Sequence, residues 1–265
     1  PHAGHDMGGT GEAAADPPAA PPPPAALSGP AHAADSLFGA EAMAEAREGL
    51  RREHGSIVTS RAMLERFEAR VGEGRDGYLV EGEAWYGGDI DKLWLKTEIE
   101  GEFGRAPEHA EVQALWSRAI DPWWNVHAGV RYDLQPDPER AHLVLGIEGL
   151  APYWIEIDAA AFLSHKGDFT ARLEAEYDQR LSRKLILQPR IEFGLSAQAV
   201  PEVGIGAGLS AAEFGLRLRY EIEPELAPYV GVAYERAFGD TADFRRDTGN
   251  RAGGWNLLLG LRAWF

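Results

Sequence analysis

Apolar residues recur at every second position in the last eleven residues of the chain, 255–265. They are Trp255, Leu257, Leu259, Leu261, Ala263 and Phe265. A period of two turns one face of a β-strand toward an apolar environment, and the opposite face here carries Asn256, Gly260 and Arg262. A strand of about 10 residues also crosses a bilayer when it is tilted. The pattern therefore predicts a β-structure with one apolar face and permits a membrane-spanning one.

The same alternation recurs in eleven further segments from about residue 61 onward. We expect them near 63–70, 78–86, 93–103, 110–116, 126–134, 143–147, 153–159, 169–177, 187–195, 212–222 and 230–234. Together with the last segment they make twelve strands, an even number, as a bacterial barrel with both termini in the periplasm requires. In the first segment we expect Met63, Glu65, Phe67 and Ala69 to share one face. Pro189 has no N–H to donate, so it predicts a bulge or a weak point in its ladder.

The predicted connections and the aromatic residues fit this arrangement. Connections at the end that holds the termini are short, whereas two connections at the other end, 197–209 and 239–254, are long, which is the pattern of outer-membrane barrels. Aromatic residues gather near the short connections, as an interfacial belt would require. They are Trp85, Tyr86, Trp94, Trp123, Trp124, Tyr153, Trp154, Tyr220, Tyr229, Trp264 and Phe265.

Composition limits the alternatives. No run of 18 apolar residues occurs, which excludes a transmembrane helix, but a barrel averages to neutral hydropathy because its two faces alternate. The net charge of −16 argues against nucleic acid as a partner, and the absence of cysteine excludes disulfides and thiolate metal sites. Because the chain starts at Pro1, we expect it to be a mature or trimmed form.

A soluble β-sandwich or a lipocalin-like barrel also alternates, so alternation by itself does not choose between them and a membrane barrel. The membrane barrel is favoured by the strand lengths, the aromatic strand ends and Phe265. A terminal aromatic residue resembles the sorting signature of Gram-negative outer-membrane barrels. The prediction is an all-β fold, an antiparallel transmembrane β-barrel of 12 strands over 61–265.

Two segments precede the predicted barrel. Residues 1–34 hold eight of the 17 prolines, among many alanines, and are expected to be a disordered Pro/Ala-rich tail. Residues 35–55 are rich in Ala, Glu and Arg and predict a helix of five turns, capped at Asp35 and Ser36 and placed at the periplasmic mouth.

Several ordered blocks within 61–265 carry a family resemblance. They include Gly87-Gly88-Asp89 before Leu93-Trp94-Leu95-Lys96, then 114–118, 129–133, 149–154, 174–178, 185–190, 215–221 and 262–265. In these blocks the chain resembles the copper-resistance outer-membrane proteins of the CopB/PcoB type. The resemblance implies a protein that binds periplasmic copper ions and exports or sequesters them, with a periplasmic copper carrier or oxidase as partner. We also expect contact with outer-membrane lipid, a monomer, and no enzymatic activity, because no strand offers a Ser/His pair and no phosphate loop or nucleophile elbow occurs.

Candidate copper ligands lie in the tail, the helix and the lumen. Imidazole suits Cu(II) and thioether suits Cu(I), so the tail cluster His2, His5 and Met7, together with His32, is a candidate site or an ordinary polar tail. This region is poorer in Met and His than the family's usual N-terminal region. Met43 and His54 lie eleven residues apart on one helix face, and we favour packing over metal binding there.

By strand parity His127 and His142 point into the lumen, at opposite ends and too far apart to share one ion. Either one is a candidate to join lumenal carboxylates in a transient site. Those carboxylates are Glu98, Glu100, Glu148, Glu156 and Asp158. The alternative, which we favour, is that the carboxylates pair with arginines and brace the barrel. His109 and His165 are expected in extracellular turns. Two further functions stay open, a structural or docking barrel with a plugged lumen and a small-solute channel without metal preference.

Overall fold

The computed structural model describes residues 28–29, 31–55, 57–72 and 76–265. The chain divides into two compact units, residues 1–55 and 56–265. Within the described part of the first unit, α2 spans Asp35–Phe38 and α3 spans Ala40–His54. None of the helices among the described residues is long and apolar enough to cross a membrane.

The helix predicted over 35–55 is broken at Gly39. This residue adopts φ +89°, a backbone conformation that favours glycine. Asp35 makes no side-chain capping hydrogen bond, so its predicted role as a cap is wrong. Its carboxylate instead accepts from Arg47 of α3, with Nη1 and Oδ1 2.5 Å apart. Gly49, by contrast, lies inside α3 and does not break it.

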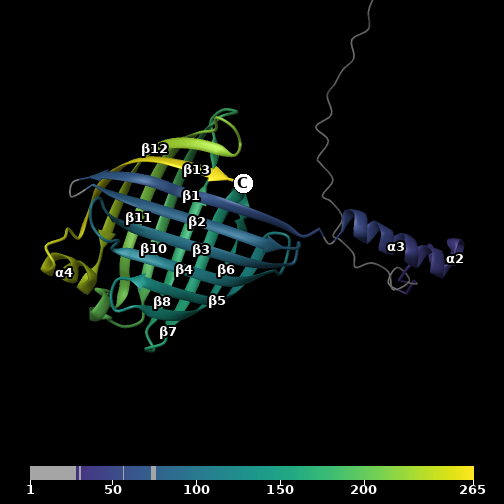
Figure 1. Ribbon diagram of the computed structural model, residues 1–265, viewed down its shortest axis with the longest axis horizontal. Helices are drawn as coiled ribbons and strands as arrows, with labels where there is room; N and C mark the ends of the chain where they lie inside the picture. Colours follow the sequence, from purple (N-terminus) through teal and green to yellow (C-terminus); the bar gives the residue numbers. More distant parts are fainter. Residues whose placement is uncertain (1–27, 30, 56, 73–75) are drawn as a thin grey trace, which may run out of the picture. The chain divides into compact units, whose positions relative to one another are not determined.

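The second unit is a closed antiparallel β-barrel (Figure 1). It closes because β1 pairs with both β2 and β13. The strands are β1 Thr59–Gly72, β2 Gly77–Gly87, β3 Asp91–Glu102, β4 His109–Ala119, β5 Trp124–Gln135, β6 Arg140–Ala151, β7 Ile155–Ser164, β8 Phe169–Tyr177, β9 Gln179–Arg180, β10 Leu185–Ser196, β11 Gly208–Tyr220, β12 Leu226–Ala237 and β13 Gly253–Trp264. Since β8 and β9 pair with successive parts of β10, they form one interrupted strand, and the barrel has the predicted twelve.

The two faces of the wall alternate as predicted, with apolar side chains outside and charged ones inside. On β13, Leu257 and Leu259 are more than 60% exposed, whereas Arg66, Glu68 and Arg70 on the neighbouring β1 are buried. A soluble protein places these two classes the other way round. The outward apolar surface is what hydrocarbon requires of a spanning barrel.

One predicted face, on β1, is wrong. The pairing register shifts after Leu64 on both sides of β1, so Glu65 is an extra residue in the strand. Such a β-bulge reverses the parity of all later residues. Met63 is therefore buried inside whereas Phe67 is 54% exposed on the outer wall, and the two do not share a face.

The weak point predicted at Pro189 is confirmed. Opposite Pro189 the strand pairing is missing, and β8 ends at Tyr177 while β9 begins at Gln179. The partners on either side, Leu187 with Gln179 and Arg190 with Glu176, keep one register, so no bulge is present on this side. The missing N–H donor of proline explains an interruption without a shift.

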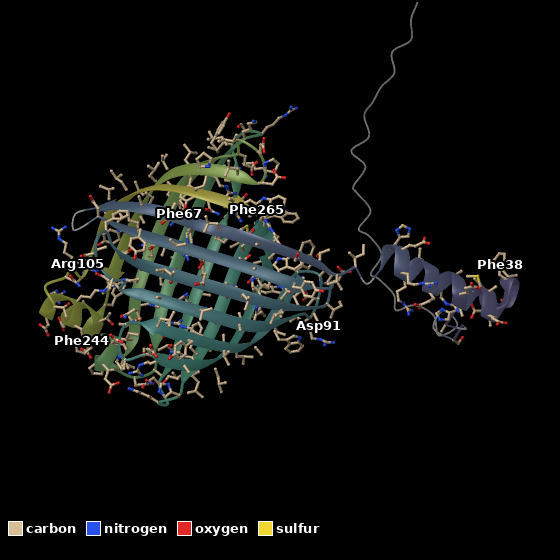
Figure 2. All side chains as sticks on the ribbon, in the orientation of Figure 1. Phe38, Phe67, Asp91, Arg105, Phe244 and Phe265 are labelled. Atoms are coloured by element: carbon tan, nitrogen blue, oxygen red, sulfur yellow. The ribbon has the colours of Figure 1, made fainter. Side chains whose placement is uncertain are left out.

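The two ends of the barrel differ. Figure 2 shows Asp91 and Phe265 at one end, here termed the terminal end, and Arg105 and Phe244 at the other, the loop end. The two long connections lie at the loop end, where one forms the short 3-10 helix η2, Pro201–Val203, and the other forms α4, Gly239–Asp247. They contact each other, because the Gly206 N–H donates to Thr241 Oγ1 at 2.8 Å.

Candidate functional site in the barrel lumen

The inner wall carries a network of buried and half-buried ion pairs, which we call the arginine lattice. Its six guanidinium groups come from β1, β5, β8, β10 and β11. They are Arg66, Arg70, Arg131, Arg172, Arg190 and Arg217. Their carboxylate partners are Glu68, Glu81, Glu98, Glu100, Glu111, Asp133, Glu174, Glu192, Glu213 and Glu235.

Shared carboxylates join these pairs into one continuous network. Glu111 lies 2.8 Å from Arg131 and 3.1 Å from Arg172. Glu192 links Arg172 to Arg190, and Glu213 lies within 3.9 Å of four arginines, Arg66, Arg70, Arg190 and Arg217. Charge-assisted bonds of this kind satisfy charges that would otherwise be costly to bury. The lattice therefore braces strands from opposite parts of the wall.

Carboxylates outnumber guanidinium groups in the lattice. Ten carboxylates face six guanidinium groups, so if all are ionised four negative charges remain uncompensated within it. On its loop side opens a cavity of about 1280 Å³, lined among others by His109, His142, Glu98 and Glu100. A water-filled space with excess negative charge attracts cations more than anions.

Two histidines that line this cavity contact carboxylates of the lattice. His142 Nε2 lies 3.0 Å from Asp133, and His109 Nε2 lies 2.9 Å from Glu111. Arg131 contacts both carboxylates, at 2.5 Å for Asp133 and 2.8 Å for Glu111. A carboxylate on one ring nitrogen orients the imidazole and leaves its other nitrogen for a ligand.

His109 was predicted in an extracellular turn, and that prediction is wrong. His109 is the first residue of β4, and its ring faces the lumen. Ligand atoms of Glu98, His109 and Glu111 lie within 4.8 Å of one another, a spacing that permits a metal ion. However, both glutamates are also paired with Arg172, which opposes a cation there. The signal in the sequence was parity, because His109 stands in the same row as Glu111 and Gln113.

A second lumenal cluster lies nearer the terminal end. Lys96 of β3 places its ammonium 2.9 Å from Glu148 of β6 and 2.7 Å from Asp158 of β7. His127 of β5 is 4% exposed, and its Nε2 lies 3.8 Å from Glu148 Oε2. Its ring lies 5.2 Å from that of Trp94. Three of the predicted ligands, His127, Glu148 and Asp158, therefore come together.

Trp94 and Tyr229 do not belong to the predicted aromatic belt. Trp94 is buried inside the barrel with Leu115, Val144 and Phe162. The indole N–H of Trp94 donates to Glu83 at 3.0 Å. Tyr229 is also buried, and its hydroxyl donates to Glu68 at 3.1 Å. Strand parity would have placed both inside, whereas their position near the ends of their strands suggested the interface.

The remaining predicted lumenal ligands are dispersed. Glu98 and Glu100 belong to the arginine lattice, at 2.9 Å from Arg172 and Arg70 respectively. Glu156 stands opposite Glu176 in the β7–β8 register. His127 pairs with Gly146, and His142 pairs with Arg131, four residues away on each strand. That separation is about 13 Å along the wall, so the two histidines do not meet.

The predicted ligands in the N-terminal unit lie apart as well. His2, His5 and Met7 are outside the described residues. His32 and His54 are exposed and Met43 is half-buried. Eleven residues of helix separate Met43 from His54 by about 16 Å, so they cannot bind one ion together.

At the loop end, ion pairs hold the η2 connection against the barrel. Arg140 contacts both Asp168 and Glu202, and Lys166 Nζ lies 2.8 Å from Glu202. The hydrogen bond from Lys166 and its charge hold the pKa of Glu202 below its ordinary value. His165 lies in the β7–β8 turn, as predicted, and accepts from the Ala141 N–H at 3.2 Å.

Comparison with known proteins identifies the family of this chain. The family model described as "Copper resistance protein B precursor (CopB)" matches residues 58–265. The chain belongs to the copper resistance protein B family. It is 41% identical over 212 residues to the "Copper resistance protein B homolog" of Pseudomonas syringae pv. tomato, covering 80% of this chain and 72% of that protein. It is 39% identical to the "Copper resistance protein B" of Escherichia coli, with 80% and 71% coverage.

The fold and the family together give the location of this copper resistance protein B family member. The NanC porin superposes with a TM-score of 0.50 at 11% identity, covering 77% of this chain and 99% of that one, which supports the fold alone. A closed twelve-stranded barrel with an apolar outer wall, in this family, lies in the bacterial outer membrane. Both termini of such a barrel face the periplasm, so the terminal end is periplasmic and the loop end extracellular.

Proposed function

We propose that this protein is an outer-membrane copper-resistance protein that binds periplasmic copper ions and exports or sequesters them. The observation that carries the proposal is the family match, which covers the whole barrel, residues 58–265. The two relatives are named for copper resistance, and each aligns over 212 residues. Copper is the cargo in this proposal.

Capture begins in the periplasmic N-terminal unit. His2, His5 and Met7, within six residues, and His32 further along the tail offer imidazole for Cu(II) and thioether for Cu(I). Met43 and His54 supply a further thioether and imidazole, each as a separate weak contact on α3. A periplasmic copper carrier or oxidase of the same resistance system delivers the metal to this unit.

Movement through the lumen proceeds by weak, successive binding. Conduction requires that an ion leave each site as readily as it enters, so single histidines beside carboxylates suit it better than a closed cage. His127 with Glu148 and Asp158 forms the periplasmic step, next to Glu156, and Glu98, Glu100 and His142 line the extracellular cavity. With all ten carboxylates of the arginine lattice ionised, its four excess negative charges favour a cation between these steps.

The continuity of the arginine lattice favours one rival function, a structural or docking barrel that conducts nothing. The lattice joins strands on opposite parts of the wall through Glu111, Glu192 and Glu213. A small-solute channel without metal preference is the other rival. Conductance in planar bilayers separates the channel from the plugged barrel, and metal-dependent protection of cells separates copper resistance from both.

Titration of the refolded protein with copper tests the proposal. Cu(I) and Cu(II), each with a competing chelator, are added to the full chain and to a form lacking residues 1–34. We expect the full chain to bind and the shortened form to retain weaker binding in the barrel or on α3. If neither form binds copper, the proposal fails. If binding disappears on truncation, the capture site stands and the lumenal route fails.

A further inference from the structure

Two carboxylates face each other on neighbouring strands of the periplasmic half of the lumen. Glu148 on β6 and Asp158 on β7 are directly opposite in the register. Like charges in this position repel each other unless a cation lies between them. Lys96 provides one, because its Nζ lies 2.9 Å from Glu148 Oε2 and 2.7 Å from Asp158 Oδ2. The pair already functions as a cation site, and its occupant is a tethered ammonium.

The imidazole beside this pair lacks the partners that a buried histidine normally has. Neither ring nitrogen of His127 makes a hydrogen bond, although the residue is 4% exposed. An unsatisfied buried polar atom costs free energy and calls for an explanation such as a bound ion. A cavity of about 80 Å³ lies here, lined among others by Lys96, His127, Gly146 and Asp158. Its volume exceeds that of one water molecule, so a metal ion held directly by the side chains has room there.

The Lys96 ammonium has a further carboxylate in its surroundings. Glu83 is its direct cross-strand partner on β2, and Glu83 also lines the cavity. With Glu83, Glu148 and Asp158 ionised, three carboxylates surround one ammonium, which leaves two negative charges. A divalent ion would balance them if Lys96 moved to Glu83.

We infer that His127, Glu148 and Asp158 form a divalent metal site that the Lys96 ammonium closes and that opens when the ammonium moves to Glu83. One imidazole and two carboxylates are nitrogen and oxygen ligands, which suit Cu(II) and give no thioether or thiolate for Cu(I). The identity of the ion rests on the proposed function. The competing lysine keeps the site weak, and it displaces the metal when it returns, which is what a step in a conduction path needs.

Removing the ammonium tests this mechanism. Lys96→Met is made in a full-length background in which His2, His5, His32 and His54 are replaced by alanine, so that tail binding does not obscure the lumen. Cu(II) is titrated with a chelator, and nitrogen splitting is recorded by electron paramagnetic resonance. Because Lys96 no longer competes for the two carboxylates, we expect the Kd of Cu(II) to fall by about tenfold or more.

The matched control is Lys92→Met, which removes an ammonium on the same strand four residues earlier. Lys92 lies over the Trp85 ring, 5.2 Å from its centroid, so we expect no gain in affinity. Adding His127→Ala to Lys96→Met should abolish the gain and remove one imidazole nitrogen from the spectrum. An unchanged Kd in Lys96→Met, or a gain that His127→Ala leaves intact, overturns the inference.

Folding and the wider proposal are checked separately. If Lys96→Met does not refold, as judged by heat-dependent migration in gels, Lys96→Gln replaces it, since the amide still donates to both carboxylates and a smaller gain is expected. Copper binding by the unmodified full chain without a His127-dependent gain in either Lys96 variant overturns this inference and leaves the proposed function standing. No copper binding by the unmodified full chain overturns both.

Discussion

Removing Arg217 should destabilise the barrel more than removing any exposed arginine. The Arg217 and Glu68 side chains are 2% and 0% exposed, and Arg217 Nε donates to Glu68 Oε1 at 2.6 Å. Losing one partner of a buried pair costs about 3–5 kcal/mol because the other charge stays buried. Arg70 and Tyr229 still donate to Glu68, at 3.2 and 3.1 Å, so Arg217→Met should cost about 3 kcal/mol, the lower end of that range.

Urea-induced unfolding of the refolded barrel, followed by tryptophan fluorescence, measures this loss. Arg180→Met is the matched control, because Arg180 is 61% exposed and pairs with Glu221 at 3.2 Å. Exposed pairs contribute less than about 1 kcal/mol, so the control should barely change the midpoint. Adding Glu68→Gln to Arg217→Met should recover part of the loss, since it removes the buried charge that has lost its closest partner. Equal losses for Arg217→Met and Arg180→Met would refute the view that the lattice braces the barrel.

Two further predictions concern the loop end and the interrupted strand. The chain has no cysteine, so a nitroxide label at Val203→Cys reports on the η2 connection alone. Lys166 lowers the pKa of Glu202, so the ion pair between them should persist from neutral pH to below the ordinary carboxyl pKa of 4.5. Label mobility should therefore rise only in more acidic buffer. A rise already near pH 6, or the same profile in Glu202→Gln, would contradict this. Pro189→Val restores an N–H opposite Tyr177, so strand pairing should extend across the gap between β8 and β9. The barrel should become more stable by about 0.5–1 kcal/mol in the same urea assay. A lower midpoint would show that proline is not the cause of the interruption.

The outer wall was predictable from the sequence because one period decides it. The outer face of each strand contacts hydrocarbon and the inner face carries charge, so apolar and polar residues alternate, as at Leu257 and Leu259. The number of strands and the positions of the long connections follow from this alternation. A β-bulge produces no such pattern in the sequence. Glu65 is a single extra residue in β1, and it moved Phe67 to the face opposite that of Met63.

The lumen was harder to predict because ion pairs there do not follow the register. Lys96 is hydrogen-bonded along β3 to β2 and β4, but its ammonium crosses to β6 and β7. Long side chains thus connect strands that pairing keeps apart. Parity placed His127 and His142 inside, and the same rule applied to His109 would have placed it inside as well, where it contacts Glu111.

Growth in graded copper tests the central claim most directly. A copper-sensitive Gram-negative strain expresses the full chain, and an otherwise identical strain carries the empty vector. We expect higher tolerance of copper with the protein present and unchanged tolerance of an unrelated stress such as high salt. Equal copper tolerance in the two strains, with the barrel folded in the outer membrane, would contradict a role in copper resistance.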